Sequence, residues 1–338
     1  MQAKAAIGAR RLCYFAHYHP AGLVADYVLH YLDALKRAGF AVVVASTAAL
    51  GETEADKLRG ACERLILREN RGLDFGSWID CHAAVPPDGA EFLLLCNDSV
   101  YGPIGSLADC IDRLTRTPAD FYGLVANEQL GRHIQSWFVL LRPAAFQSPA
   151  FRERFSSPIP DGVAKDEVIL HYEVGLSRDL EAAGLGGHAL YDADRHGLLA
   201  RKMPFNPTHF LWEELIAEIG IPFLKVDLLR DNPLFVDDLD RWRQVVARRA
   251  PSLVPAIEAD VAARRRAAGS PARPAGGAGR RLLVAYLRWF RRCAVRDYRY
   301  ASDRRPLRMR LNAAWFSAGL FAYRVALKAL RLMRLGSG

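Results

Sequence analysis

Three short polar residues, Asn97-Asp98-Ser99, follow directly after the apolar run Phe92–Cys96. Five apolar residues in a row are typical of a strand that is buried on both faces, as in a parallel sheet. Such a strand would place Asp98 at the carboxyl edge of the sheet, which is where open α/β folds bind their ligands. The alternative is that Asp98 only caps the following turn, since Asp is common in turns for local hydrogen-bonding reasons.

A second group of polar residues lies at 68–78, in the sequence R-E-N-R-G-L-D-F-G-S-W. We expect a loop here, between a short strand at 65–67 and a helix at 79–84. Gly72 would permit a backbone geometry that other residues resist. Arg68 and Arg71 could meet a phosphate, and Asp74 could meet a ribose or a base. An ordinary strand-to-helix loop would explain the same residue types.

The elements that must position these groups follow from the apolar pattern. The strand at 11–16, the helix at 24–38 and the strand at 40–45 form a β-α-β unit, whose crossover is expected to be right-handed. Further strands are expected at 92–96, 121–126 and 133–141, and further helices at 52–64, 106–115, 146–155, 165–184, 237–250 and 256–266. Thr208 is a candidate N-cap for a helix ending near 220. This order predicts an α/β fold with a central, mostly parallel sheet.

Charge divides the chain into two parts. Residues 264–338 hold 19 Lys and Arg but only 2 Asp and Glu, a net charge of +17, so residues 1–263 carry −8 of the total of +9. We expect an α/β domain at 1–263, a Gly/Pro/Ala/Arg linker at 264–279 and a basic amphipathic helical tail at 280–338. Such a tail is typical of a segment that meets an anionic membrane surface. The alternative is a helical hairpin that packs on the domain.

The six cysteines form no C-x-x-C pair and are expected to be reduced, as in the cytoplasm. The N-terminus lacks the long apolar core of a signal peptide, and no stretch reaches the roughly 18 to 20 apolar residues of a membrane span. The tail interleaves arginine with Leu and Trp in amphipathic stripes, unlike the exposed aromatic platforms of single-strand binders, so no nucleic acid is expected as a partner. The predicted location is the cytoplasm, at an anionic membrane surface.

Several of these motifs together resemble the rhamnan synthesis protein F family of bacterial polysaccharide glycosyltransferases. The matching stretches occur in the same order along roughly residues 11–235: R-E-N-R-G-L-D-F-G-S-W at 68–78, N-D-S-V-Y-G-P at 97–103, H-I-Q-S-W-F at 133–138, Y-E-V-G-L-S-R-D-L-E-A-A-G at 172–184, and N-P-T-H-F-L-W through L-L-R-D-N-P at 206–233.

The resemblance implies a GT-A-like fold, in which an Asp-x-Asp motif at a strand end usually holds a divalent metal against the donor diphosphate. Here the equivalent place reads Asn97-Asp98-Ser99, with one carboxylate where two are common. The departure puts metal use in doubt, although Asp98 with the Asn97 carbonyl and water could still hold Mg²⁺ or Mn²⁺.

The resemblance also supplies a candidate catalytic base. Inverting GT-A enzymes often have an acidic pair that opens a helix, and the stretch beginning at Glu173 is similar to that pattern. Val174 stands where the usual catalytic acid would be, so Glu173 is the first candidate for the base, with Asp166 or Glu167 in reserve. A surface glutamate on an amphipathic helix is the structural alternative.

Further residues receive roles from the same resemblance. The donor nucleotide would be bound by His17, His19, Ser46, Arg68, Asn70, Gly72, Asp74, Asn97 and Asp98. The sugar or the acceptor would meet His133, Gln135, Trp137 and His209, although Trp137 could equally be part of the core, and His209 could be structural.

The resemblance implies a transferase, of the inverting hexosyltransferase type. It would move a sugar such as rhamnose from a nucleotide-sugar donor, dTDP-rhamnose or similar, to a lipid-linked glycan in cell-surface polysaccharide or O-antigen (lipopolysaccharide) biosynthesis. The alternative function is a non-catalytic component of a polysaccharide assembly complex that binds a nucleotide or a glycan.

Overall fold

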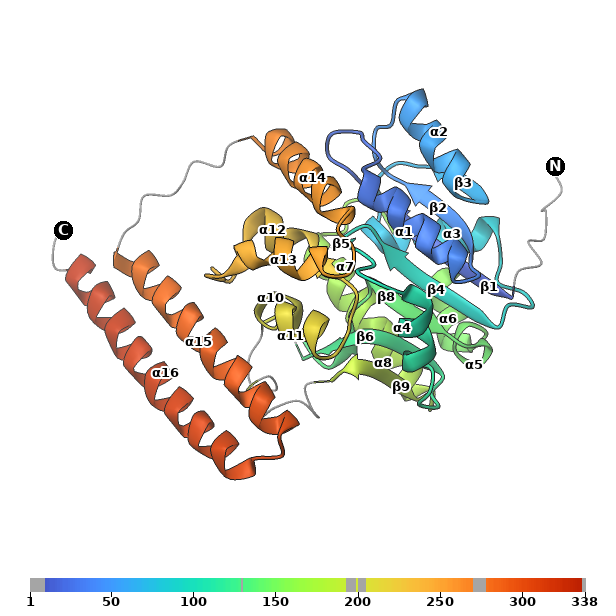
Figure 1. Ribbon diagram of the computed structural model, residues 1–338. Helices are drawn as coiled ribbons and strands as arrows, with labels where there is room; N and C mark the ends of the chain where they lie inside the picture. The colour runs from blue at the N-terminus through green and yellow to red at the C-terminus, as the bar shows by residue number, and fades with distance from the viewer. Residues whose placement is uncertain (1–9, 129, 193–198, 200–204, 270–277, 336–338) are drawn as a thin grey trace.

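A computed structural model of the chain describes residues 10–128, 130–192, 199, 205–269 and 278–335. Its centre is an eight-stranded mixed sheet with the order β3-β2-β1-β4-β8-β6-β7, and β9 pairs with β6 outside this path (Figure 1). The parallel strands on one side are β1 (Arg11–His17), β2 (Ala41–Ser46), β3 (Arg64–Leu67) and β4 (Phe92–Asn97). The other side holds β6 (Phe121–Asn127), β7 (His133–Ile134), β8 (Phe138–Leu141) and β9 (Gly187–Tyr191). The predicted α/β class with a mostly parallel sheet is confirmed.

Helices cover both faces of this sheet. Alternate residues of each central strand point to opposite sides, and on β1 both sets are buried in apolar clusters. On β1, Cys13 and Phe15 belong to one core cluster, whereas Leu12 and Tyr14 belong to the other. The first cluster also contains residues of α1 (Asp26–Arg37), α2 (Glu52–Ala61), α4 (Leu107–Leu114) and α14 (Leu253–Ala267). The second contains residues of α3 (Leu73–Ala84), α5 (Pro143–Phe146), α6 (Pro149–Phe155), α7 (Lys165–Val168) and α8 (Gly175–Ala182).

Several predicted elements have other bounds in the structure: the strand expected at 133–141 is divided into β7 and β8, and two of the helices also differ. The helix α3 begins at Leu73, so residues 73–78 are helical, whereas the sequence indicated a loop there. The predicted helix at 165–184 is interrupted by a π-helical segment, η1 (Ile169–Val174), between α7 and α8. A π-helical turn widens the helix locally and is often found at functional sites.

A helical region follows the sheet. Its short elements are β5 (Val100–Tyr101), α10 (Pro207–Phe210), α11 (Trp212–Ala217), β10 (Leu224–Lys225), α12 (Val226–Asp231), η3 (Leu239–Arg241) and α13 (Trp242–Ala247). The strand β10 pairs antiparallel with β5, which ties this region to the segment just after β4. The helix α14 continues to Ala267, beyond the boundary that we expected at residue 263.

The basic tail forms a hairpin of two long helices, α15 (Ala278–Ser302) and α16 (Pro306–Leu335), which Figure 1 shows on one side of the molecule. Phe290, Cys293 and Tyr298 of α15 are buried in the same core cluster as the sheet, so α15 packs on the body as one alternative predicted. None of the helices in the described ranges is long and apolar enough to cross a membrane.

Candidate functional site

A cavity of about 470 Å³ lies where the carboxyl ends of β1, β4 and β6 meet. Tyr18, Asn97 and Asn127 line it from these three strand ends, and the opposite wall comes from α3, η1, β10, α12 and α14. It brings together eight of the residues selected from the sequence: Asp74, Asn97, Asp98, His133, Gln135, Trp137, Asp166 and Glu173. The expectation that the carboxyl edge of the sheet is the binding edge agrees with this placement.

Two carboxyl groups, Asp98 and Asp74, share one side of the cavity. Asp98 is 7% exposed and accepts a hydrogen bond from the Tyr18 backbone N–H at 3.1 Å. Burial raises the pKa of Asp98 to about 6, and the positive charge of Arg264 limits the rise. Burial, together with the charge of Asp98, also raises the pKa of Asp74 to about 6. Asn97, which directly precedes Asp98 in the chain, links the two: its Nδ2 donates to Asp74 Oδ2 at 2.6 Å.

The two histidines at the end of β1 are buried behind Asp98 and do not line the cavity. His17 Nδ1 lies 2.9 Å from Ser46 Oγ, and burial lowers the pKa of His17 to about 3, so its ring is neutral. His19 Nε2 lies 3.1 Å from Asp260 Oδ1 on α14. Protein encloses all three side chains, those of His17, His19 and Ser46. The structure therefore does not support the prediction that they contact the donor nucleotide.

Glu173 reaches the cavity from the π-helical segment η1. Its Oε1 accepts a hydrogen bond from the Ser136 backbone N–H at 2.9 Å and lies 4.0 Å from His133 Nε2. His133 Nδ1 is 2.8 Å from the Gly131 carbonyl, to which it can only donate, so Nε2 of a neutral ring is left as an acceptor. The side chain of Glu173 is 20% exposed, which leaves its carboxylate accessible from the cavity. Asp166, the reserve candidate, is exposed on α7.

Three cationic side chains also line the cavity: Lys225, Arg230 and Arg264. They are not among the site residues that the sequence predicted. Lys225 ends a stretch that matches the family motifs, and Arg264 lies four residues after Asp260, the spacing of a helical ion pair; these were the available signals. Arg264 donates from Nε to Asp260 Oδ2 at 2.9 Å and from Nη2 to the Tyr27 hydroxyl at 2.9 Å.

A chain of side-chain amides forms the floor beneath Lys225. Gln135 Nε2 donates to Asn206 Oδ1 at 2.7 Å, and Trp137 Nε1 donates to Gln135 Oε1 at 2.6 Å. Asn206 also caps α10 by accepting from the Thr208 backbone N–H, so Asn206 rather than Thr208 is the N-cap. The Trp137 ring is 3% exposed and packs on Phe223, so little of it is available to the sugar or the acceptor that it was predicted to meet.

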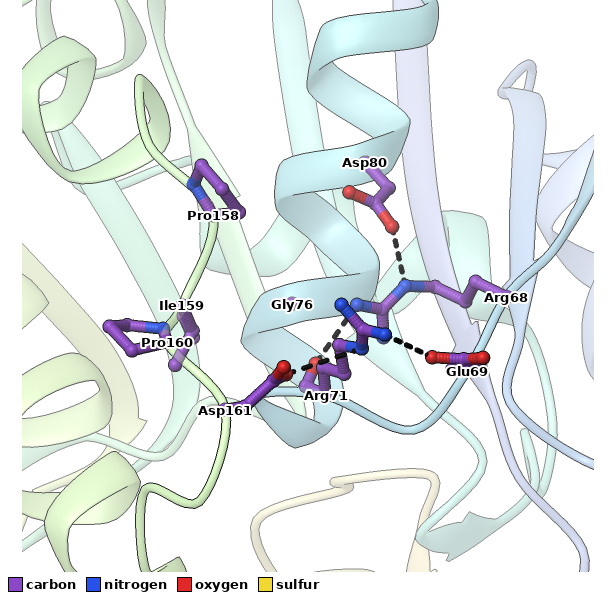
Figure 2. Close-up of a pocket in the computed structure, with 9 residues that line it drawn as sticks. All are labelled: Arg68, Glu69, Arg71, Gly76, Asp80, Pro158, Ile159, Pro160 and Asp161. Atoms are coloured by element: carbon purple, nitrogen blue, oxygen red, sulfur yellow. Dashed lines mark hydrogen bonds and ion pairs between the residues drawn. The ribbon is translucent and has the colours of Figure 1, made fainter.

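Arg68 lies in a different cavity, of about 610 Å³, on the outer side of α3 (Figure 2). It is held by Asp80 and by the Arg71 carbonyl, and Arg71 pairs with Glu69 and with Asp161 of the loop that Figure 2 shows opposite α3. Gly72 has a φ of +67° and precedes α3, and Asn70 is exposed. The predicted donor-binding role of Arg68, Asn70 and Gly72 would place them with Asp98, and the structure separates them from it.

His209 also lies outside the main cavity and acts on it through Asp227. Its Nε2 is 3.0 Å from Asp227 Oδ1. Burial alone would raise the pKa of Asp227, but the His209 hydrogen bond and the charge of Lys225 outweigh it and hold that pKa well below its usual range. His209 therefore positions an ionised carboxylate at the cavity wall.

The residues around Asp98 fit a divalent metal poorly. Asn97 Oδ1, a proposed ligand, already accepts hydrogen bonds from the Ser99 backbone N–H at 3.1 Å and from Ser99 Oγ at 2.6 Å. Asp98 Oδ2 accepts from Tyr18 and lies 3.8 Å from Arg264 Nη2. Within the described part of the chain, no three His, Cys, Asp or Glu side chains are grouped so that they could hold a metal ion.

Comparisons with known proteins place the chain in a family. Two relatives are 29% identical: the uncharacterized protein y4gN of Sinorhizobium fredii over 180 residues (52% of this chain, 46% of that protein), and the virulence protein VirA of Vibrio anguillarum over 203 residues (51% and 64%). The chain thus matches about half to two thirds of the length of these relatives. The crystal structure of S. aureus TarS 1–349 aligns with 91% of this chain and 92% of its own, but at 10% identity and a TM-score of 0.31, which is too low to carry an argument.

The model of one family, described as rhamnan synthesis protein F, matches residues 42–249. This region includes α3, β4, η1, β10 and α12, which supply most of the cavity wall. Since the match covers more than half of the 338 residues, the chain belongs to the rhamnan synthesis protein F family, as its sequence motifs indicated.

Proposed function

We propose that the protein is a glycosyltransferase that moves a sugar from a nucleotide-sugar donor to a glycan during bacterial polysaccharide synthesis. The observation that carries this proposal is that one cavity, at the carboxyl edge of the sheet, contains both an accessible carboxylate, Glu173, and the ammonium of Lys225. Glycosyl transfer needs a base for the acceptor hydroxyl and positive charge for the leaving diphosphate. Family membership supports the same class of reaction.

In this proposal Glu173 is the general base. Its Oε1 is oriented by the Ser136 backbone N–H, and Oε2 is the oxygen available to an acceptor hydroxyl. A single displacement with one base inverts the anomeric centre, so inversion is the expected stereochemistry. Asp166 at the exposed end of α7 is the second candidate for the base.

The donor that we propose is dTDP-rhamnose or a similar nucleotide hexose, and the proposed acceptor is a lipid-linked glycan of a surface polysaccharide such as the O-antigen. The support for a lipid-bound acceptor is α16. Leu307, Leu311, Trp315, Phe321 and Val325 are all more than half exposed. At about 100° per residue these five side chains share one face, opposite Asn312 and Phe316, which pack on α15.

Basic residues flank this exposed face, Arg308 on one side and Arg310 and Lys328 on the other. A helix with an apolar face bordered by cations binds at the surface of anionic membranes. We therefore propose that the protein binds peripherally to the inner face of the bacterial inner membrane through α16. The apolar face of α15 does not take part, because it packs on the body of the protein.

The experiment compares the purified full chain with Glu173→Gln and with the matched control Glu153→Gln, an exposed acid of α6. Each protein receives a panel of radiolabelled dTDP-, UDP- and GDP-sugars with membranes from a polysaccharide-producing bacterium, and label transferred to lipid-extractable glycan is counted. One donor should be turned over, and Glu173→Gln should lower the rate by about 10² to 10⁴-fold with the donor Kd unchanged. Donor binding without transfer by the wild type would instead assign the protein the non-catalytic binding function.

A further inference from the structure

The strand end where the family resemblance allowed a divalent metal already has protein cations beside it. Asp98 Oδ2 lies 3.8 Å from the buried guanidinium of Arg264, and the next residue, Ser99, lies beside Lys225. Asn97 Oδ1, which could have ligated a metal together with Asp98, already accepts hydrogen bonds from the backbone N–H and the hydroxyl of Ser99. The positive charge at this edge of the sheet therefore comes from side chains.

Main-chain pairing fixes the position of Lys225. In the short β10–β5 ladder Lys225 is opposite Val100, and the Val226 backbone N–H donates to the Ser99 carbonyl at 3.0 Å. This register places the lysine beside Ser99, two residues after the end of β4. Its Nζ then donates to Ser99 Oγ at 3.0 Å and lies 5.9 Å from the centre of the Trp137 ring, within the range of a cation–π contact.

Lys225 differs from the other two cations of the cavity in its partners. Arg264 is neutralised by Asp260 at 2.9 Å, and Arg230 is paired with its neighbour Asp231. Among the residues that the structure describes, Lys225 makes no ion pair with a carboxylate, and its two contacts are to neutral groups. Its charge still acts across the cavity, since it helps to hold the pKa of Asp227 below its usual range.

We infer that Lys225 takes the role that a divalent metal has in related reactions: its ammonium binds the diphosphate of the donor and neutralises the charge that develops on the leaving nucleoside diphosphate. The inference rests on the proposed function. In the transfer step the bond between the anomeric carbon and the diphosphate oxygen breaks, that oxygen keeps the electron pair, the acceptor oxygen forms the new bond, and its proton goes to Glu173. Arg264 Nη2 lies 3.8 Å from Asp98 Oδ2 and fills the position beside it, so that no metal is required.

Calorimetric titration of the full chain with dTDP, UDP and GDP, each against its free nucleoside, tests this inference. The variants are Lys225→Met, which removes the charge at similar length, Lys225→Arg, which keeps it, and Lys36→Met, which removes one exposed lysine from α1 as a control. Each titration is run with Mg²⁺, with Mn²⁺ and with a chelator. Circular dichroism of each variant checks that it is folded.

One nucleoside diphosphate should bind the wild type with the same Kd, within about twofold, in all three conditions. Lys225→Met should weaken that binding by about 10- to 100-fold, as expected for loss of a charge-assisted contact, and should leave nucleoside binding unchanged. Lys225→Arg should recover most of the loss, and Lys36→Met should bind as the wild type does.

Binding that is lost with the chelator and restored by Mg²⁺ or Mn²⁺ would overturn the inference while leaving the proposed transferase intact. Equal binding by the wild type and Lys225→Met would overturn it as well. If no nucleoside diphosphate binds and no nucleotide sugar is turned over, the proposed function itself is refuted, and the inference falls with it.

Discussion

Asp260 of α14 is the residue whose replacement best tests how the helix that carries Arg264 is held in place. It is 2% exposed and accepts hydrogen bonds from His19 Nε2 at 3.1 Å, the Tyr101 hydroxyl at 2.6 Å and Arg264 Nε at 2.9 Å. Burial acts to raise the pKa of Asp260, but these partners outweigh it and lower that pKa. The carboxylate is therefore ionised at neutral pH and joins α14 to β1 and β5.

Asp260→Ala leaves the buried guanidinium of Arg264 with Asp98 as its remaining carboxylate, at 3.8 Å, and removes a partner from His19 and Tyr101. Removing one partner of a buried ion pair typically lowers the free energy of unfolding by about 3 to 5 kcal/mol. Replacing both partners with apolar groups of similar size is often nearly neutral. Asp260→Leu combined with Arg264→Met should thus lose less than the sum of the two single changes, by about 2 kcal/mol or more.

Urea unfolding of the full chain, followed by far-ultraviolet circular dichroism at pH 7, measures these free energies. The matched control is Glu258→Ala on the same helix, whose ion pair with Arg243 is exposed and should contribute less than about 1 kcal/mol. Because the pKa of Asp260 is lowered on folding, its contribution is present above the unfolded pKa of about 3.9 and is lost as the pH falls below it. A loss below 1 kcal/mol for Asp260→Ala at pH 7 would refute the view that this cluster docks α14.

Three further outcomes are expected. Asp74→Asn should raise the free energy of unfolding by about 1 to 3 kcal/mol above pH 6 and have little effect below pH 4. The reason is that folding raises the pKa of Asp74 to about 6, so the ionised carboxylate destabilises the folded state. Urea unfolding at several pH values measures this trend, which would be absent if the carboxyl were well solvated. Gly72→Ala should lower the free energy of unfolding by about 1 to 3 kcal/mol, because the φ of Gly72 is +67° and the new Cβ would lie 2.6 Å from the Ile159 side chain. A Tm equal to that of the wild type would contradict that packing. Replacing Trp315 and Phe321 with Asp should weaken co-sedimentation with vesicles containing anionic lipid by at least about tenfold. The control, which replaces the exposed residues Thr117 and Ser156 of the body with Asp, should not; equal loss in both would mean that charge alone governs binding.

The sheet could be predicted because its central strands are short apolar runs. β1, β2 and β4 lie within one residue of the predicted ranges at each end. An apolar run of five or six residues between polar turns is the length of a strand buried on both faces and is too short for a buried helix. The start of α3 was missed because Gly72 and Gly76 suggested a loop. Gly72 supplies the left-handed residue before the helix, but Gly76 lies inside it, where an added Cβ would be 2.0 Å from the Arg71 carbonyl.

The acidic side of the site was predictable, and its cationic side was not. Asp98 and Glu173 are close to family motifs in which each has an expected role, so the sequence indicated both. Lys225 also lies in a stretch that matches the family motifs, but its place beside Asp98 depends on a two-residue ladder with β5, an interaction between positions 125 residues apart that no local pattern records. Periodicity shows that a residue is on a strand or a helix, but it does not show which distant strand end that residue covers.

Arg264 illustrates the same limit at the boundary of the family region. Composition assigned it to a basic linker, because the run Arg264-Arg265-Arg266 precedes a segment rich in Gly, Pro and Ala. In the structure it is 5% exposed and lines the cavity, and its charge is balanced by Asp260 and Asp98. The family match ends at residue 249, yet α14 begins at Leu253 and closes one wall of the site. A chain shortened to the matched region would therefore expose Asp98 and lose its cationic neighbour, so the functional unit of this protein extends at least to Ala267.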